Sequence, residues 1–291
     1  MINEESAASN SILNFTVDPN YSGKNLPGWF LMNTYLQRHL GQVMHFQPQD
    51  DFDSGRAAVL SGQFDLVYAN PFDWVQYQQK LAFRPIVKPR NHFDEVYLCG
   101  KADGPMHSPE DFPERIRIAS AHPGTLVHMV GLFLMDKADI DRARLEFVFT
   151  GSYQGVLKAL LQGQADLGFL FDEVYLSASK LIRERLRIID QSDDAFAFHA
   201  FCIGPRLFSQ QDMLTDLLCA MDADVRGKVL LDDLGFAGFE AVSEDEIACL
   251  STLADEYISG HEAIDIRATS SLEVADSAFV VAREDPGEGT N

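Results

Sequence analysis

A nine-residue pattern that occurs twice constrains the fold of this chain more than any other feature. Ala58–Leu66 reads AVLSGQFDL, and Ala159–Leu167, which starts 101 positions later, reads ALLQGQADL. Each copy is typical of an apolar helix that ends at a Gly-Gln turn and is followed by a buried strand. Glycine suits the end of a helix because it adopts the left-handed conformation without strain. The repeat therefore predicts two similar structural units.

The predicted elements around the two copies follow the same order. In the first half, strands at 13–17, 43–46 and 66–68 alternate with helices at 29–40 and 55–60. In the second half, strands at 116–119, 145–149 and 167–171 alternate with helices at 126–135 and 155–161. Alternation of this kind is typical of parallel strands with right-handed crossovers. We therefore predict an α/β fold with two similar βαβαβ lobes.

Two further apolar segments, 95–99 and 196–202, bracket the second unit. We interpret them as a pair of hinge strands that cross between the lobes. In this interpretation residues 11–97 and 203–260 form lobe 1, residues 98–202 form lobe 2, and residues 261–291 form a partly disordered C-terminal extension. Helical periodicity at 213–223 and 245–257 adds two helices to lobe 1.

The charge of the chain excludes some partners. The 44 Asp and Glu residues outnumber the 23 Lys and Arg residues, which gives a net charge of -21. Because this charge repels phosphate backbones and anionic lipids, we expect no nucleic-acid partner. No apolar run approaches the roughly 20 residues that span a bilayer, so no membrane insertion is expected. The first residues lack a secretion signal, which predicts a cytoplasmic protein, or a periplasmic one if a leader was removed.

Cysteine and histidine spacing does not indicate a metal site or a cofactor. The four cysteines show no CxxC pattern, and we expect them to be free thiols. His122 and His128 stand six positions apart without a neighbouring set of carboxylates. We expect no metal and no cofactor, and these two histidines, together with His92, instead suit a pH-sensitive anion site.

Ligands of open α/β sheets bind beyond the carboxyl ends of the strands. This rule selects the loops 18–29, 70–73, 121–128, 151–154 and 171–173, with 91–94 at the edge of the cleft. The candidate ligand-binding residues in these loops are Asp18, Tyr21, Asn70, Phe72, Asp73, Phe93, His122, Thr125, His128, Ser152, Tyr153 and Asp172. No catalytic residue is assigned.

Most of these candidates have a structural alternative. Asn70, Asp73 and Ser152 each suit the first position of a helix, so they either cap that helix or contact a ligand. The aromatic candidates either stack on an organic ligand or pack in a lobe core. Asp172 either pairs with a cationic group of a ligand or caps a helix.

Several segments resemble the phosphate/phosphonate solute-binding proteins of ABC transporters. These segments are Arg117–Thr125, Phe147–Tyr153 and Leu160–Asp166, together with Asn70–Trp74, which is similar to the Gly-Pro-Phe loop of that family. The matches run from about residue 13 to 258 in the family's order. The resemblance implies a type II periplasmic-binding-protein-like fold that closes about its hinge on a small anionic or zwitterionic solute. It also implies a membrane permease as the partner.

The sequence departs from that family where phosphonate oxygens are held. The family has a Pro-x-Ser-Thr-Ser-Gly run, whereas Pro123–His128 keeps only the hydroxyl of Thr125, and the family's Ser-His pair is Ser152-Tyr153 here. Each lost hydrogen bond to a charged group removes roughly 1.5 to 3 kcal/mol of binding free energy. The ligand is therefore left open between a phosphonate or phosphate and a related organic molecule.

Three functions are compatible with these patterns. The first is reversible solute binding for a transporter. The second is a cytosolic sensor of the same fold that presents its closed state to a regulatory protein. The third is a lyase or a cofactor-biosynthesis enzyme, in which His122, His128, Asp73 or Cys99 would carry the chemistry. No catalytic triad spacing or phosphate-binding glycine loop supports the third.

Overall fold

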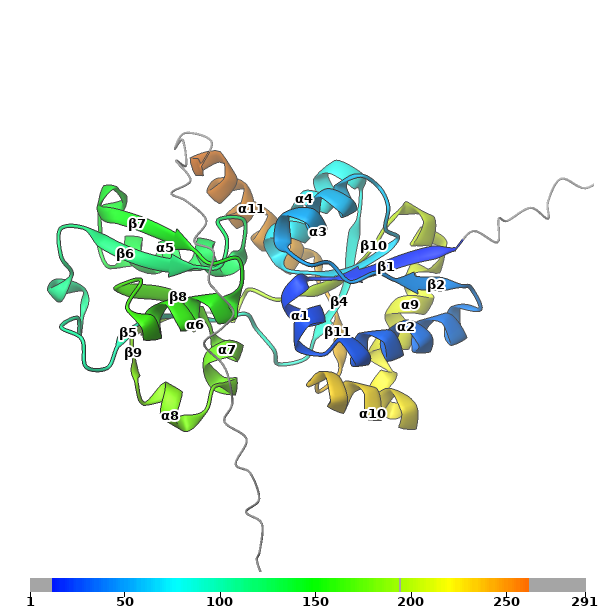
Figure 1. Ribbon diagram of the computed structural model, residues 1–291. Coiled ribbons are helices and arrows are strands. Elements are labelled where there is room, and N and C mark those ends of the chain that lie inside the picture. Colours follow the sequence, from blue (N-terminus) through cyan, green and yellow to red (C-terminus); the bar gives the residue numbers. More distant parts are fainter. Residues whose placement is uncertain (1–11, 194, 262–291) are drawn as a thin grey trace, which may run out of the picture.

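The structure is a computed structural model that describes residues 12–193 and 195–261, without the side chains of 258–261. Two mixed sheets lie in separate lobes, and helices cover both of them (Figure 1). The predicted α/β fold with two lobes is confirmed. No helix in the described ranges is long and apolar enough to cross a membrane.

The sheet of lobe 1 has the strand order β2-β1-β3-β10-β4-β11. Its strands are β1 (Leu13–Val17), β2 (Met44–Phe46), β3 (Leu66–Ala69), β4 (Arg84–Pro89), β10 (Ala200–Ile203) and β11 (Phe239–Ala241). Strands β1, β2 and β3 are parallel, whereas β10 runs antiparallel to both of its neighbours. The helices of this lobe are α1 (Pro19–Lys24), α2 (Leu26–Leu40), α3 (Phe52–Leu60), α4 (Pro71–Leu81), α9 (Gln211–Cys219), α10 (Val225–Leu234) and α11 (Glu244–His261).

The sheet of lobe 2 has the order β7-β6-β8-β5-β9. Its strands are β5 (Val96–Lys101), β6 (Ile116–Ser120), β7 (Leu145–Phe149), β8 (Leu167–Phe171) and β9 (Leu186–Gln191), and its helices are α5 (Leu126–Lys137), α6 (Tyr153–Gln162), α7 (Asp172–Ser177) and α8 (Lys180–Arg183). Short 3-10 helices occur at Pro109–Asp111 and Arg142–Arg144 here, and at Pro205–Gln210 and Met221–Ala223 in lobe 1. Three parallel strands followed by an antiparallel one therefore occur in both sheets.

The repeated Gly-Gln-x-Asp pattern makes the same turn in both lobes. Gly62 and Gly163 have φ angles of +81° and +73°, the left-handed conformation expected at the end of a helix. In lobe 1, Asp65 accepts a hydrogen bond from the Asn14 amide at 2.8 Å. In lobe 2, Asp166 accepts one from the Arg117 amide at 3.1 Å. The repeated aspartate thus joins the start of a central strand to the neighbouring strand.

The expected pair of hinge strands is wrong in one respect. Segments 95–99 and 196–202 do not pair with each other, because β5 pairs with β8 and β9 and β10 pairs with β3 and β4. The chain crosses between the sheets just before these strands, at 90–95 and again between β9 and β10. The expected boundaries at 97/98 and 202/203 therefore fall within β5 and β10, and the division into lobes stays our proposal with the boundaries at these crossings.

The two crossing segments run side by side and carry unusual backbone angles. The Asp94 amide donates to the Ala197 carbonyl at 2.8 Å, which joins one crossing to the other. Asn91 and Ala195, one in each crossing, both have a φ angle of +51°. Left-handed backbone at an alanine is strained, and such strain is characteristic of segments that change conformation.

The C-terminal helix α11 connects the lobes a third time. It packs along α4 in lobe 1 and lies between the lobes in Figure 1. The Tyr257 hydroxyl donates to the Pro123 carbonyl of lobe 2 at 3.0 Å, while the Tyr257 ring packs on Phe72 of lobe 1. The predicted extension 261–291 lies, apart from its first residue, outside the described residues.

The two copies of the repeated aspartate differ in burial, which yields a test. The Asp65 side chain is 6% exposed and pairs with Arg206, whereas the Asp166 side chain is 26% exposed. We expect Asp65→Ala to lower the free energy of unfolding by about 2 kcal/mol, because it leaves a strand amide without its acceptor. Asp166→Ala should lower the free energy of unfolding by about half as much, because water can replace the Asp166 carboxylate as the partner of Arg117. Urea unfolding of both variants measures the difference, and equal losses would contradict this account.

Candidate functional site

The lobes meet at the carboxyl ends of their parallel strands. Phe52 at the start of α3 in lobe 1 packs against two residues of lobe 2, with ring centroids 5.7 Å from Tyr153 and 6.0 Å from His122. Phe52 and Tyr153 are nearly fully buried. The edges at which a ligand of an open α/β sheet binds therefore face each other across the lobe contact.

Asn70 organises a buried group of carboxylates in lobe 1. Its side-chain oxygen accepts from the Asp73 amide and caps α4, while its Nδ2 donates to Asp18 and to Asp73, at 2.8 Å in each case. Asp18 in turn accepts from the Asn20 amide and caps α1. The predicted capping role of Asn70 is present, and the same side chain also brings two carboxylates together at the lobe contact.

Arg56 joins this carboxylate group to lobe 2. Its Nε lies 2.5 Å from an Asp73 oxygen, and its Nη2 donates to the Gly124 carbonyl at 2.5 Å. Burial raises the pKa of Asp73, although Arg56 opposes that shift. The absence of a side chain at Gly124 allows this close approach, since a Cβ there would lie 2.8 Å from the Arg56 Nη1.

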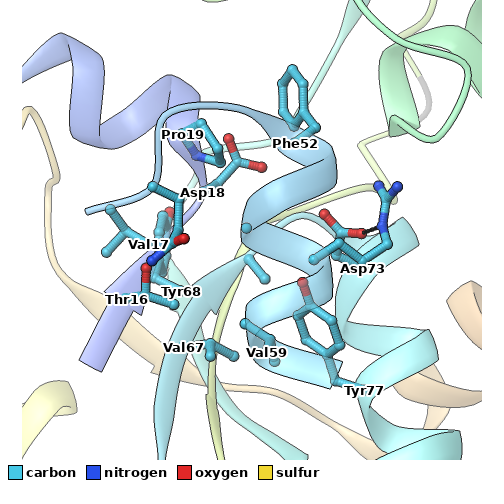
Figure 2. A pocket seen from close by; sticks show the side chains of 14 residues that line it. Thr16, Val17, Asp18, Pro19, Phe52, Val59, Val67, Tyr68, Asp73 and Tyr77 are labelled. Carbon is cyan, nitrogen blue, oxygen red and sulfur yellow. Dashed lines mark hydrogen bonds and ion pairs between the residues drawn. The ribbon is translucent and has the colours of Figure 1, made fainter. Parts of the chain in front are cut away.

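A pocket lies on the lobe 1 side of this contact, between β1, β3, α3 and α4. Figure 2 shows Phe52 at its top and Val59, Val67 and Tyr77 at its bottom, and the dashed line marks the ion pair of Asp73. The cavity volume is about 20 Å³, which is room for a water molecule. All the residues that line this pocket belong to lobe 1, and the cavity as it stands is too small for a phosphonate or a sulfonate.

Glu173 makes a second polar contact between the lobes. This residue of α7 in lobe 2 lies 3.0 Å from Lys24 of lobe 1 and 2.7 Å from His92 of the first crossing. The Tyr21 hydroxyl of lobe 1 donates to it at 3.3 Å. Burial raises the pKa of Glu173, but His92 and Lys24 outweigh that effect and lower the pKa to about 2. At the neighbouring Asp172, burial outweighs the attraction of His92 and raises the pKa to about 7.

His199 lies next to the two crossings, between two buried carboxylates. Its Nδ1 is 2.7 Å from Asp94 of the first crossing, and its Nε2 is 3.6 Å from Asp18. Burial lowers the pKa of His199, yet Asp94 and Asp18 together raise it to about 10. A protonated His199 therefore links both crossings to the end of β1.

Several predicted residues lie outside this polar cluster. His122 packs on Phe52 and bonds to Asp53, and Thr125 caps α5. Ser152 caps α6, and Tyr153 is buried against Phe52 and Phe171.

His128 is buried in lobe 2 among Phe147, Phe149 and Phe169, with its Nδ1 3.0 Å from the Ser120 hydroxyl. Phe93 faces the buried Lys88, with 5.2 Å between the Lys88 Nζ and the ring centroid. Ligand contact by any of the predicted residues stays a prediction.

The sequence interpretation missed Arg56, Glu173, Lys24, Asp94 and His199. Arg56 is the second residue of the predicted helix 55–60 and lies outside the loops at the strand ends. Glu173, Asp94 and Lys24 did fall within selected loops, but other residues of those loops were chosen. His199 was assigned to a strand interior, where a polar side chain indicates a buried partner. Among the described residues, no group of three or more His, Cys, Asp or Glu side chains has the geometry of a metal site.

The adjacent carboxylates of α7 should respond oppositely to neutralisation. At neutral pH, Glu173→Gln loses the ion pairs with Lys24 and His92, so we expect a lower melting temperature. Asp172→Asn should raise it, because the native carboxyl retains a proton that the unfolded chain has already released.

The direction of the pH dependence follows from the coupling between proton binding and folding. A carboxyl whose pKa rises to about 7 on folding makes stability fall as the pH rises from 3.8 to about 7. The gain from Asp172→Asn should therefore be present at pH 8 and absent at pH 4. Melting temperatures of both variants at these two pH values measure it, and a destabilised Asp172→Asn at pH 8 would refute the assignment.

Three solved structures that share this fold are distant from the chain in sequence. The chain superposes on PhnD1 of Prochlorococcus marinus in complex with methylphosphonate with a TM-score of 0.73, at 12% identity over 85% of this chain and 98% of that one. A binding protein component of an ABC phosphonate transporter from Pseudomonas aeruginosa gives a TM-score of 0.70, at 15% identity over 87% and 89% of the two chains. The periplasmic aliphatic sulphonate binding protein SsuA of Escherichia coli gives 0.65, at 13% identity over 87% and 93%. These similarities establish the type II periplasmic-binding-protein fold. No curated protein matches the sequence.

A family model provides the closer assignment. The model described as "ABC transporter, phosphonate, periplasmic substrate-binding protein" matches residues 15–247. This span runs from β1 to the start of α11 and includes both sheets, both crossings and every candidate site residue. This chain therefore belongs to the family of periplasmic substrate-binding proteins of phosphonate ABC transporters.

Proposed function

We propose that the protein binds a small anionic or zwitterionic solute between its lobes and closes on it as the solute-binding component of an ABC transporter. The observation that carries this proposal is the contact between the carboxyl ends of the two sheets. Arg56 and Glu173 bridge the lobes there, and the adjoining cavity is only about 20 Å³. The proposal couples solute entry to lobe movement, which is the requirement for reporting occupancy to a partner.

The charges around the contact favour a ligand that carries an acidic group. Four cationic side chains, Lys24, Arg56, His92 and His199, lie among the carboxylates of this region. Lys24 and His92 share Glu173, Arg56 pairs with Asp73, and His199 lies between Asp18 and Asp94, so a bound anion would replace one of these carboxylates as the partner of a cation. A ligand that also has a cationic group can exchange with one of these pairs, which extends the class to zwitterions. Phosphonates and sulfonates, the ligands named for the structural relatives, both fit.

Transport requires a partner and a compartment. Family membership supports a membrane permease as the partner and the periplasm as the compartment, reached after removal of a leader. The solute would be released when the permease separates the lobes and breaks the contacts of Arg56 and Glu173. In this scheme the permease recognises the closed conformation of the protein and not an exposed docking motif.

A thermal-shift panel tests the proposal. Methylphosphonate, phosphate, aminomethylphosphonate and methanesulfonate are each added to the full chain, with sodium chloride of equal ionic strength as the control. A ligand at 100 times its Kd adds about 2.7 kcal/mol of stability, which corresponds to a rise of roughly 5 °C or more. We expect at least one of the four to produce such a rise. No shift with any of them would contradict binding of small oxyanions.

A further inference from the structure

In the turn of lobe 2 that faces Arg56, residues 122–128, the side-chain hydroxyl forms its hydrogen bonds within the turn. The Thr125 hydroxyl donates to the His122 carbonyl at 2.8 Å and accepts from the His128 amide at 3.3 Å. The Gly124 amide donates to the His122 Nδ1 at 3.0 Å. Leu126 and Val127, the next two residues, are apolar and buried. The side chains of this turn therefore offer a solute no free hydroxyl, and a strong donor for an anion must come from lobe 1.

Arg56 is suited to supply that donor. A guanidinium has five N–H groups, and two of those of Arg56 are used by Asp73 and by Gly124. Asp53 also lies near Arg56, but its Oδ1 is 3.7 Å from Nη1, beyond hydrogen-bond distance. The outer edge of the guanidinium, formed by Nη1 and Nη2, can therefore bond two oxygens of one acidic group.

The surroundings of Arg56 hold this edge in place. Its side chain is 14% exposed, and its guanidinium carbon lies 5.3 Å from the centre of the Phe72 ring. Asp73, which binds Nε, is anchored by the capping residue Asn70. Because the side chain is held at its Nε and against an aromatic ring, little conformational entropy is lost when Nη1 and Nη2 bind an anion.

We propose that Arg56 is the specificity-determining residue that holds the acidic group of the solute, in place of the hydroxyls that this chain lacks in lobe 2. The proposal rests on the solute-binding function proposed above. As the lobes part, the bond from Nη2 to the Gly124 carbonyl breaks, and the two N–H groups become available to an oxyanion. The solute then takes the position of the Gly124 carbonyl as the acceptor, so that Arg56 connects the lobes through the solute.

A matched pair of ligands distinguishes this role from a merely structural one. Methylphosphonate and methanesulfonate have the same shape, but at pH 8 the first carries about two negative charges and the second carries one. Titration calorimetry measures both affinities for the native chain and for Arg56→Gln, Arg56→Lys and Arg38→Gln. Arg38 is an exposed residue of α2 and serves as the control. Melting curves without ligand verify that each variant folds.

We expect Arg56→Gln to weaken methylphosphonate binding by roughly 10- to 100-fold, which corresponds to the loss of a charge-assisted pair of hydrogen bonds. Methanesulfonate should lose less, so the ratio of the two affinities should fall. Arg56→Lys should keep the ratio and lose part of the affinity, because the charge remains without the planar pair of donors. Arg38→Gln should match the native chain.

The outcomes separate this proposal from the function on which it rests. If the native chain binds at least one of the two anions and Arg56→Gln binds it equally well, the role of Arg56 is refuted while solute binding stands. If Arg56→Gln weakens both ligands by the same factor, Arg56 acts through lobe closure alone and the proposal is wrong. If the native chain binds neither anion, both the proposed function and the role of Arg56 are overturned.

Discussion

The protonated His199 between Asp18 and Asp94 is the interaction on which the arrangement of the two lobes depends. All three side chains are almost fully buried, and they come from the second crossing, the end of β1 and the first crossing. A buried charge is tolerated only when it is paired, so these three segments cannot separate without leaving a buried charge alone. The cluster therefore fixes the two crossings at the point where both sheets direct their carboxyl ends toward the cleft.

A second buried cation holds the other side of the same crossings. Lys88 of β4 lies 2.7 Å from Glu246 and 3.0 Å from Glu240, and its Nζ is about equally close to the rings of Phe93 and Phe198. The two rings belong to the two crossings. The two crossings are thus held by one imidazolium and one ammonium, and both of these cations are buried.

The sequence predicted the architecture well because the architecture follows from repeated local patterns. The Gly-Gln-x-Asp turn recurs with the same backbone angles and the same strand-to-strand hydrogen bond, and the loops at the strand ends contain most of the polar cluster. The positions at which the chain crosses between the lobes were harder to predict. The apolar segments 95–99 and 196–202 have similar sequences, but the first belongs to the sheet of lobe 2 and the second leads into the sheet of lobe 1. Pairing between distant strands is set by tertiary packing, which local patterns do not encode.

The partners of individual side chains were the least predictable part. Asp172 and Glu173 are adjacent acidic residues in one selected loop, yet only Glu173 contacts Lys24 and His92, more than 70 positions away in the sequence. Arg56 was overlooked because its partner Gly124 lies in the other lobe, 68 positions away in the sequence. Likewise, His128 looked like a residue of the anion-binding turn, but the side of α5 on which it lies faces the aromatic core. Such contacts depend on how the lobes meet.

The central claim is that solute binding and lobe contact are one event, and a distance measurement between the lobes tests it most directly. Spin labels at Arg38 in lobe 1 and at Lys180 in lobe 2, both exposed, would report the separation after Cys219 and Cys249 are replaced by serine. Our account predicts a distribution that includes long distances without ligand and narrows to one short distance with a saturating ligand from the thermal-shift panel. An identical distribution with and without a ligand that demonstrably binds would contradict it.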